Sequence, residues 1–146
     1  MLKMTQFVAH GENILKHFQH RIQQAVERFA HFPPMISQRH EISAAEGEIL
    51  GKPQSREDAE HMLRLLSGKT HQVISGIALL SADHVAVASE VTGVRFSPLS
   101  EEDVAFYVSS DEPYDKAGGY AVQGLASVYI KGIEGDYFNV VGLPVN

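Results

Sequence analysis

The sequence of 146 residues contains no cysteine. This absence excludes a disulfide framework, a metal site with thiolate ligands and a cysteine nucleophile. Long apolar runs are absent too, because no window approaches the roughly 20 apolar residues that a membrane-spanning helix requires. We therefore expect a soluble protein that does not bind membranes. The lack of cysteine fits a reducing compartment, and we expect a cytoplasmic protein.

Positive charge is scarce in this chain. It has 12 Lys and Arg against 18 Asp and Glu, which gives a formal net charge of −6. A protein that coats nucleic acid needs a basic face for the phosphates, so this balance argues against nucleic acid as a partner. A single small anion held by a few local cations remains compatible with the composition.

Glycine and aspartate are nearly absent from the first third of the chain. Residues 1–45 contain one of the twelve glycines, and the first aspartate is Asp58. The same stretch holds five Lys and Arg against three Asp and Glu, whereas the remaining residues hold seven against fifteen. We interpret residues 1–45 as a divergent N-terminal segment and residues 46–146 as an α/β domain. With 44% apolar residues the chain can bury a core.

The N-terminal segment carries one amphipathic pattern, from Glu12 to Ala30. Its apolar residues recur at spacings of four and three, which is typical of one face of a helix. These residues are Ile14, Phe18, Ile22, Val26 and Phe29. Pro33 and Pro34 end the pattern because proline cannot continue a helix. The histidines nearby lack carboxylates at ligand spacing, so we assign no metal to them.

Helical and β-rich patterns alternate after residue 45. Ser55 and Ser100 each begin a capping box, which predicts helices over Arg56–Ser67 and Glu101–Ser109, the second stopped by Pro113. Strands are expected at 73–80, 85–96, 120–133 and 138–143, the first two as a hairpin. This order indicates an α/β fold with a mixed sheet flanked by helices.

Five polar residues lie in turns or at element ends. Lys52 and Lys116 are either phosphate ligands, since an ammonium in such a turn can reach a phosphate oxygen, or ordinary surface lysines. His71 is either a general base or a structural hydrogen-bond partner. Asp136 either accepts backbone N–H bonds within its loop or helps to hold a metal, and we favour the loop role. Gln123, in an expected strand, must find partners if buried and can pair with a base edge.

Six short motifs follow one another between residues 44 and 146. They are Gly51-Lys52-Pro53, Met62-Leu63 with Leu66-Ser67-Gly68, His71-Gln72-Val73 with Gly76, Asp115-Lys116-Ala117-Gly118, Val122-Gln123-Gly124, and Gly135-Asp136-Tyr137 with Asn139-Val140-Val141-Gly142-Leu143-Pro144. In this order they resemble the Maf family of septum-formation-inhibitor-like nucleoside triphosphate pyrophosphatases. The resemblance implies a two-lobed, ITPase-like α/β fold with a cleft, here truncated or divergent at the N-terminus.

The resemblance also implies a chemistry. Family members hydrolyse nucleoside triphosphates to monophosphate and pyrophosphate with a metal ion, Mg²⁺ or Mn²⁺, and they are often dimers. On this basis Lys52, Lys116 and Gln123 are the expected substrate-binding residues, and a homodimer is expected. The pair Gln123-Gly124 resembles the branch that acts on dTTP and UTP, whereas a branch acting on methylated GTP usually carries Glu-Gly there.

Two parts of the family pattern have no counterpart in this chain. Nothing in residues 1–45 matches the Ser-x-Ser-Pro-Arg-Arg loop that grips the phosphates. The Asp-Thr pair that supplies the proposed base lies about a dozen residues before the lysine of Gly-Lys-Pro, where this chain has His40 and Glu41. We expect Glu41 to be a weak substitute for that aspartate. Three interpretations stay open: a pyrophosphatase, a nucleotide-binding remnant without turnover, and a fragment stabilised by self-association.

Overall fold

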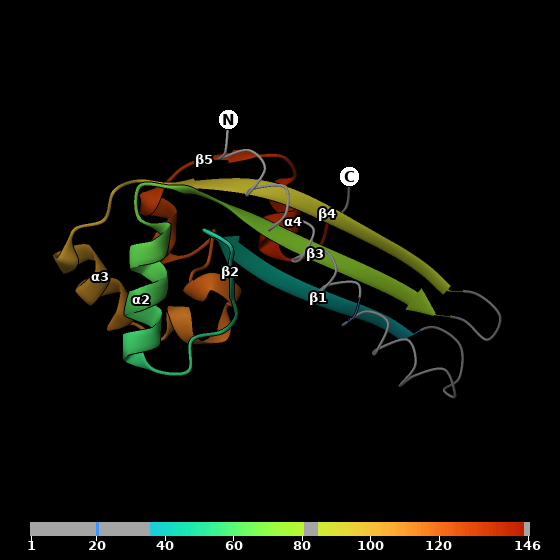
Figure 1. Ribbon diagram of the computed structural model, residues 1–146, viewed down its shortest axis with the longest axis horizontal. Coiled ribbons are helices and arrows are strands. Elements are labelled where there is room, and N and C mark those ends of the chain that lie inside the picture. The colour runs from blue at the N-terminus through green and yellow to red at the C-terminus, as the bar shows by residue number, and fades with distance from the viewer. Residues whose placement is uncertain (1–19, 21–35, 81–84, 145–146) are drawn as a thin grey trace.

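The structure is a computed structural model, and it describes residues 36–80 and 85–144 together with His20 (Figure 1). The helix expected at Glu12–Ala30 therefore lies outside the described residues, His20 apart. Within the described ranges, no helix is long and apolar enough to cross a bilayer.

A five-stranded sheet organises the part of the chain that the structure describes (Figure 1). Its strands lie in the order β2-β1-β3-β4-β5, and they are β1 Ile36–Ala45, β2 Glu48–Leu50, β3 Thr70–Leu80, β4 Val85–Phe96 and β5 Ile130–Glu134. The expected α/β class is confirmed. Each of the four pairings is antiparallel. The described sheet is therefore entirely antiparallel, whereas a mixed sheet was predicted.

The first hairpin crosses the composition change at residue 45. Glu46 and Gly47 have φ values of 51° and 90°, and Ala45 pairs with Glu48. Positive φ at both central residues is the geometry of the tight turns that match strand twist. β1 also pairs with β3 from Ile36 to Ala44. The sheet thus begins within the segment that composition separates from the domain.

The first predicted helix is confirmed as α2, Arg56–Leu66. The Ser55 hydroxyl accepts the Asp58 N–H at 3.1 Å, which caps the helix. The cap differs from the expected box, because the Asp58 carboxylate accepts the N–H of Gln54 instead of Ser55. At the other end Gly68 adopts φ +69°, as expected for a helix terminus.

The second predicted helix is confirmed as α3, Glu101–Val108, with a complete capping box. The Asp103 N–H donates to the Ser100 hydroxyl at 3.1 Å, and the Ser100 N–H donates to the Asp103 carboxylate at 2.9 Å. The prediction that Pro113 stops this helix is wrong. The helix ends at Val108, and the Ser109 hydroxyl donates a hydrogen bond to the Phe106 carbonyl at its end. Pro113 belongs to the following 3-10 helix.

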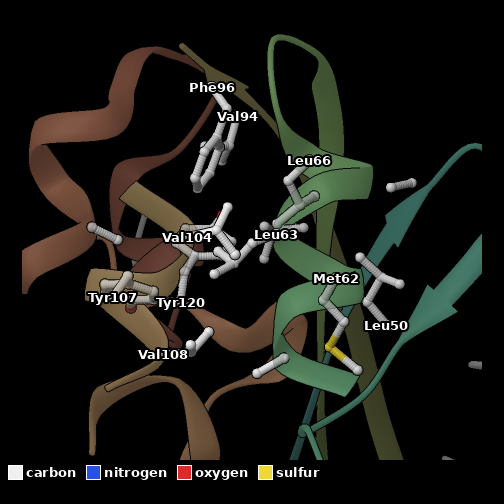
Figure 2. Packing of buried hydrophobic residues seen from close by; sticks show 14 of the residues in the cluster. Leu50, Met62, Leu63, Leu66, Val94, Phe96, Val104, Tyr107, Val108 and Tyr120 are labelled. Atoms are coloured by element: carbon white, nitrogen blue, oxygen red, sulfur yellow. The ribbon is translucent and has the colours of Figure 1, made fainter. Parts of the chain in front are cut away.

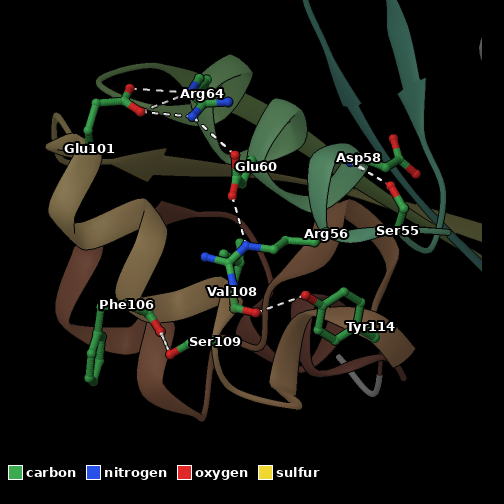
Figure 3. A network of polar contacts seen from close by, with 10 residues as sticks. All are labelled: Ser55, Arg56, Asp58, Glu60, Arg64, Glu101, Phe106, Val108, Ser109 and Tyr114. Carbon is green, nitrogen blue, oxygen red and sulfur yellow. Dashed lines mark hydrogen bonds and ion pairs between the residues drawn. The ribbon is translucent and has the colours of Figure 1, made fainter.

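The hydrophobic core lies between α2, α3 and the end of the sheet nearest to them (Figure 2). Leu63 and Leu66 face inward from α2, and Tyr107 meets them from α3. Phe96 and Val94 come from the end of β4. On the outer side, the Arg64 guanidinium of α2 contacts Glu101 of α3 and so joins the two helices (Figure 3). The same guanidinium also contacts Glu60 within α2. These groups are exposed, so the ion pairs contribute little stability.

The C-terminal third differs most from expectation. Short 3-10 helices fill it: η1 Glu112–Asp115, η2 Ala117–Gly119 and η3 Leu125–Tyr129. The strand or strand pair predicted at 120–133 is wrong except for β5, because the Gly124 turn and η3 interrupt it.

The last predicted strand, at 138–143, is also wrong, because it is the helix α4 Tyr137–Val141. Asp136 caps this helix by accepting the Phe138 N–H at 2.8 Å. The fully buried Asn139 amide then donates to the Val73 carbonyl of β3 and to the Thr92 hydroxyl of β4. These contacts fix α4 on the sheet. The apolar run favoured a strand because periodicity alone cannot separate short buried helices from strands.

Candidate functional site

Lys52 lies in the short loop that joins β2 to α2. Pro53 is buried there, and the Gln54 amide folds back to donate to the Lys52 carbonyl at 2.8 Å. The loop backbone is therefore anchored on both sides of the lysine, while the Lys52 side chain is exposed. This loop presents an ammonium group to solvent from a fixed backbone.

Lys116 lies in a second loop, between η1 and η2, which packs directly against the first. The Gly118 N–H donates to the Gly51 carbonyl at 2.9 Å. Gly118 has φ +75°, and a Cβ there would lie 2.7 Å from the Ser43 hydroxyl oxygen of β1. Only glycine fits this position without displacing its surroundings. The close approach holds the loop of Lys116 beside the loop of Lys52.

Asp115 responds to both lysines. The Lys116 ammonium forms an ion pair and hydrogen bond with its carboxylate. That hydrogen bond, followed by the charges of Lys116 and Lys52, outweighs desolvation and holds the pKa of Asp115 below its ordinary value. The structure thus brings Lys52 and Lys116 into one electrostatic neighbourhood on an exposed surface, where an anion can approach.

Gln123 lies in an exposed turn between η2 and η3. The prediction of a strand at this position is therefore wrong, and the side chain does not tie strands together. The turn forms because the Gly124 N–H returns to the Ala121 carbonyl at 3.1 Å. A solvent-exposed amide in a closed turn is free of burial constraints and can meet a ligand.

Glu112 and Tyr107 support the turn that carries Gln123. The Tyr107 hydroxyl donates to the Glu112 carboxylate at 2.8 Å, and the same carboxylate accepts the Leu125 N–H at 2.8 Å. The sequence analysis missed this contact. Gly124, next to the candidate, signals a close approach, but no spacing pattern identifies Glu112 as the group that approaches.

His71 is buried in β3, with 2% of its surface exposed. Its Nε2 lies 2.9 Å from the Tyr120 hydroxyl oxygen, and its ring also packs against Phe96. Burial lowers the pKa of His71, whereas its contact with the backbone of Val94 raises it. The effect of burial is larger, and the pKa of His71 is about 4. A buried, neutral imidazole with an aromatic partner favours the structural alternative over the general base.

The two remaining candidates are carboxylates. Asp136 has the loop role that we favoured, since it accepts the Phe138 N–H. Glu41 belongs to β1, where its backbone lies opposite Ser75, but its side chain lies outside the described residues. Among the residues that the structure does describe, no three His, Cys, Asp or Glu side chains are grouped closely enough to hold a metal ion.

Comparison with known proteins gives a consistent result. The sequence pattern of the family described as Maf-like protein matches residues 35–146. A dTTP/UTP pyrophosphatase of Symbiobacterium thermophilum is 53% identical over 105 residues, which cover 72% of this chain and 54% of that protein. The dTTP/UTP pyrophosphatase of Pyrococcus furiosus is 47% identical over 71% of this chain and 55% of that protein. The dTTP/UTP pyrophosphatase of Bacillus cereus is 48% identical over 71% of this chain and 54% of that protein.

The matched relatives are longer than this chain, which spans about half of their length. The family match begins at residue 35, one residue before β1, and continues to residue 146. It therefore includes all five strands of the described sheet, both lysine loops and the turn of Gln123. On this match the chain belongs to the Maf family.

Proposed function

We propose that this chain binds nucleoside triphosphates of the dTTP and UTP type and hydrolyses them to monophosphate and pyrophosphate. The observation that carries the proposal is the direct contact between the two lysine loops, through the bond from Gly118 to Gly51. The relatives support the substrate class, since each is named a dTTP/UTP pyrophosphatase.

The phosphates are the part of the ligand that Lys52 and Lys116 fit. Two ammonium groups that both act on Asp115 can supply positive charge to phosphate oxygens in a chain whose net charge is −6. A triphosphate carries more negative charge than a monophosphate, so such a pair discriminates in favour of the triphosphate. Asp115 then holds Lys116 in place when no anion is present.

The base is the part that Gln123 fits. A neutral side-chain amide offers one donor and one acceptor to the O4 and N3 edge of thymine or uracil. Its exposed turn leaves both groups available to a ligand. We therefore assign pyrimidine selection to Gln123.

A metal ion and Glu41 belong to the same proposal. Mg²⁺ or Mn²⁺ would neutralise phosphate oxygens, and both prefer oxygen ligands such as carboxylates. The described residues do not by themselves form such a ligand set, since Asp115 is paired with Lys116 and no three suitable side chains are grouped. Glu41 is the candidate carboxylate in this proposal.

We also propose the cytoplasm as the compartment and a homodimer as the assembly. The absence of cysteine supports the first, because it fits a reducing environment. The second rests on the family resemblance.

One experiment tests the activity. The whole chain is titrated with dTTP and Mg²⁺ in a calorimeter, and the same sample is then assayed for pyrophosphate and dTMP. The proposal predicts saturable binding and equal amounts of both products. Binding without products would instead support a nucleotide-binding remnant. A chain that neither binds nor turns over dTTP would contradict the proposal altogether.

A further inference from the structure

A side-chain contact supports the exposed turn from Ala121 to Ala126, which presents Gln123. The Glu112 carboxylate accepts the Leu125 N–H at 2.8 Å through Oε2 and the Ala126 N–H at 3.3 Å through Oε1. Both amides belong to the start of η3, directly after Gln123 and Gly124. One carboxylate thus closes the C-terminal side of the turn.

Tyr107 closes the other side. Its hydroxyl accepts the Ala121 N–H at 3.3 Å and donates to Glu112 Oε1 at 2.8 Å. Tyr107 is itself fixed, because it is fully buried in the core and its ring packs edge-on against Tyr129. The pair Tyr107–Glu112 therefore bonds to backbone groups on both sides of Gln123.

The Glu112 carboxylate lies so close to the backbone of Gly124 that no room remains for a side chain on this residue. A Cβ on Gly124 would lie 2.1 Å from Glu112 Oε2, so any side chain there must displace the carboxylate. Burial raises the pKa of Glu112, but its hydrogen bonds and the charge of Lys116 together outweigh this and lower the pKa. The carboxylate is therefore ionised at neutral pH and accepts all three donors.

Glu112 also lies in η1, the 3-10 helix directly before Lys116, which is the proposed phosphate-binding residue. It is the first residue of η1, and Lys116 directly follows Asp115, the last residue of η1. A shift of Glu112 would move the turn of Gln123 relative to the loop of Lys116. The distance between a base and its phosphates is fixed by the nucleotide, so this spacing matters for a ligand that touches both.

We propose that Glu112 is a positioning residue for base recognition, which with Tyr107 holds the turn so that Gln123 reads a pyrimidine while Lys116 holds its phosphates. This inference rests on the proposed nucleotide binding and adds a residue that does not touch the ligand. A carboxylate suits the role because its two oxygens accept every donor present. An amide of the same shape has a single acceptor oxygen and would turn an N–H group towards another donor.

The first test compares Glu112→Gln with Asp111→Asn. Asp111 is an exposed neighbour without a capping hydrogen bond, so its variant controls for the loss of one negative charge. Calorimetry gives the dissociation constants of dTTP and dGTP for each variant. We expect Glu112→Gln to lower the preference for dTTP roughly tenfold, as the loss of one well-placed hydrogen bond would, and Asp111→Asn to retain it. An unchanged preference in Glu112→Gln would overturn the positioning role.

A double-mutant cycle separates positioning from a structural role. If Glu112 acts through Gln123, Glu112→Gln should not change the dTTP to dGTP ratio in a Gln123→Ala background. A merely structural contribution would weaken both nucleotides equally in either background. Full additivity of the two effects on the ratio would therefore contradict the inference. Gly124→Ala, which displaces the carboxylate sterically, should reproduce the effect of Glu112→Gln.

A measurement without nucleotide distinguishes failure of this inference from failure of the proposed function. In the nuclear magnetic resonance spectrum of the whole chain, the amide signals of Leu125 and Ala126 should shift in Glu112→Gln and stay in place in Asp111→Asn. Unmoved signals would show that Glu112 does not hold the turn, whatever the ligand. If these signals move but the unaltered protein does not prefer dTTP, the proposed function is wrong and base recognition by this turn falls with it.

Discussion

Lys52 illustrates at the residue scale how a weak sequence signal gains meaning from its neighbours. A lysine between glycine and proline is unremarkable alone. The structure adds a second loop whose Gly118 N–H bonds to the Gly51 carbonyl, and a carboxylate, Asp115, that both lysines influence. A phosphate could exploit two cations whose charges both act on one exposed carboxylate, of which only Lys116 contacts it directly.

Replacing Lys52 by alanine should weaken dTTP binding about 10- to 100-fold, the range expected for one charge-assisted hydrogen bond. Binding of dTMP should change much less, because it lacks the outer phosphates. Calorimetric titration of both ligands measures the difference. Lys131→Ala removes an exposed lysine from β5 and serves as the control for net charge. Equal losses for dTTP and dTMP would argue against a phosphate role for Lys52.

Replacing Gln123 by glutamate should exchange the base preference. Glutamate offers only acceptors, which suit the donor-rich edge of guanine, so the ratio of dTTP to GTP affinity should fall by about one to two powers of ten. Because Gln123 is exposed in a turn, the melting temperature should stay near that of the unaltered protein. The variant Gln123→Ala shows how much of the change comes from losing the contact with the pyrimidine base. The remaining change in Gln123→Glu is then the gain in preference for guanine. An unchanged ratio would end the assignment of Gln123 to base selection.

The sequence predicts the backbone around the two candidate lysines better than the backbone around Gln123. Lys52 and Lys116 are predicted outside regular helices and strands, and both lie in loops. Gln123 was expected inside the strand or strand pair predicted at 120–133. The local sequence does not reveal that Glu112 accepts the backbone N–H of Leu125, where the chain turns. That contact depends on tertiary structure and has no local signal.

At the scale of elements, capping residues are the most reliable part of the sequence. α2 and α3 begin where Ser55 and Ser100 predict, because side-chain caps act within three residues and need no tertiary partner. The strand hairpin β3–β4 follows from its apolar, β-branched runs. The helix α4 could not be predicted, since its position depends on Asn139 reaching carbonyl and hydroxyl oxygens in β3 and β4.

Ser100→Ala should lower the free energy of unfolding by about 1 kcal/mol, because it removes the acceptor for the Asp103 N–H at the start of α3. Ser127→Ala replaces an exposed serine within η3 and should change stability by only a few tenths of that amount. Urea denaturation of both variants gives the comparison. Equal midpoints for the two variants would show that the cap does not contribute to stability.

At the scale of the whole molecule, the sheet and the helices pack around a core beside which a histidine is buried. His71 lies in β3, where its ring makes a T-shaped contact and a hydrogen bond with Tyr120 and a tilted contact with Phe96. A neutral imidazole is tolerated there, whereas a charged one would be buried in apolar surroundings.

This burial makes stability depend on pH in a defined window. The pKa of His71 falls from its ordinary value of 6.5 to about 4 on folding. Between these values the unfolded chain binds a proton that the folded protein does not, so the free energy of unfolding decreases as pH falls from 6.5 to 4. The loss is about 3 kcal/mol at pH 4 and is absent above pH 6.5.

The variant His71→Gln can still bond to Tyr120 but does not titrate. Its free energy of unfolding should therefore fall less than that of the unaltered protein between pH 6.5 and 4, while the carboxylates contribute equally to both. Urea denaturation across this range measures the two slopes. Parallel slopes would show that His71 is not buried as a neutral side chain in solution.

The central claim is that the loops of Lys52 and Lys116 and the turn of Gln123 form one nucleotide site. The most direct test is to follow the backbone amide signals of the whole chain by nuclear magnetic resonance during titration with dTTP and then with dTMP. The account predicts that dTTP shifts residues 51–54 and 115–126 together, and that dTMP shifts chiefly the turn around Gln123. Shifts confined to other parts of the sheet, or no shifts in either lysine loop, would contradict it.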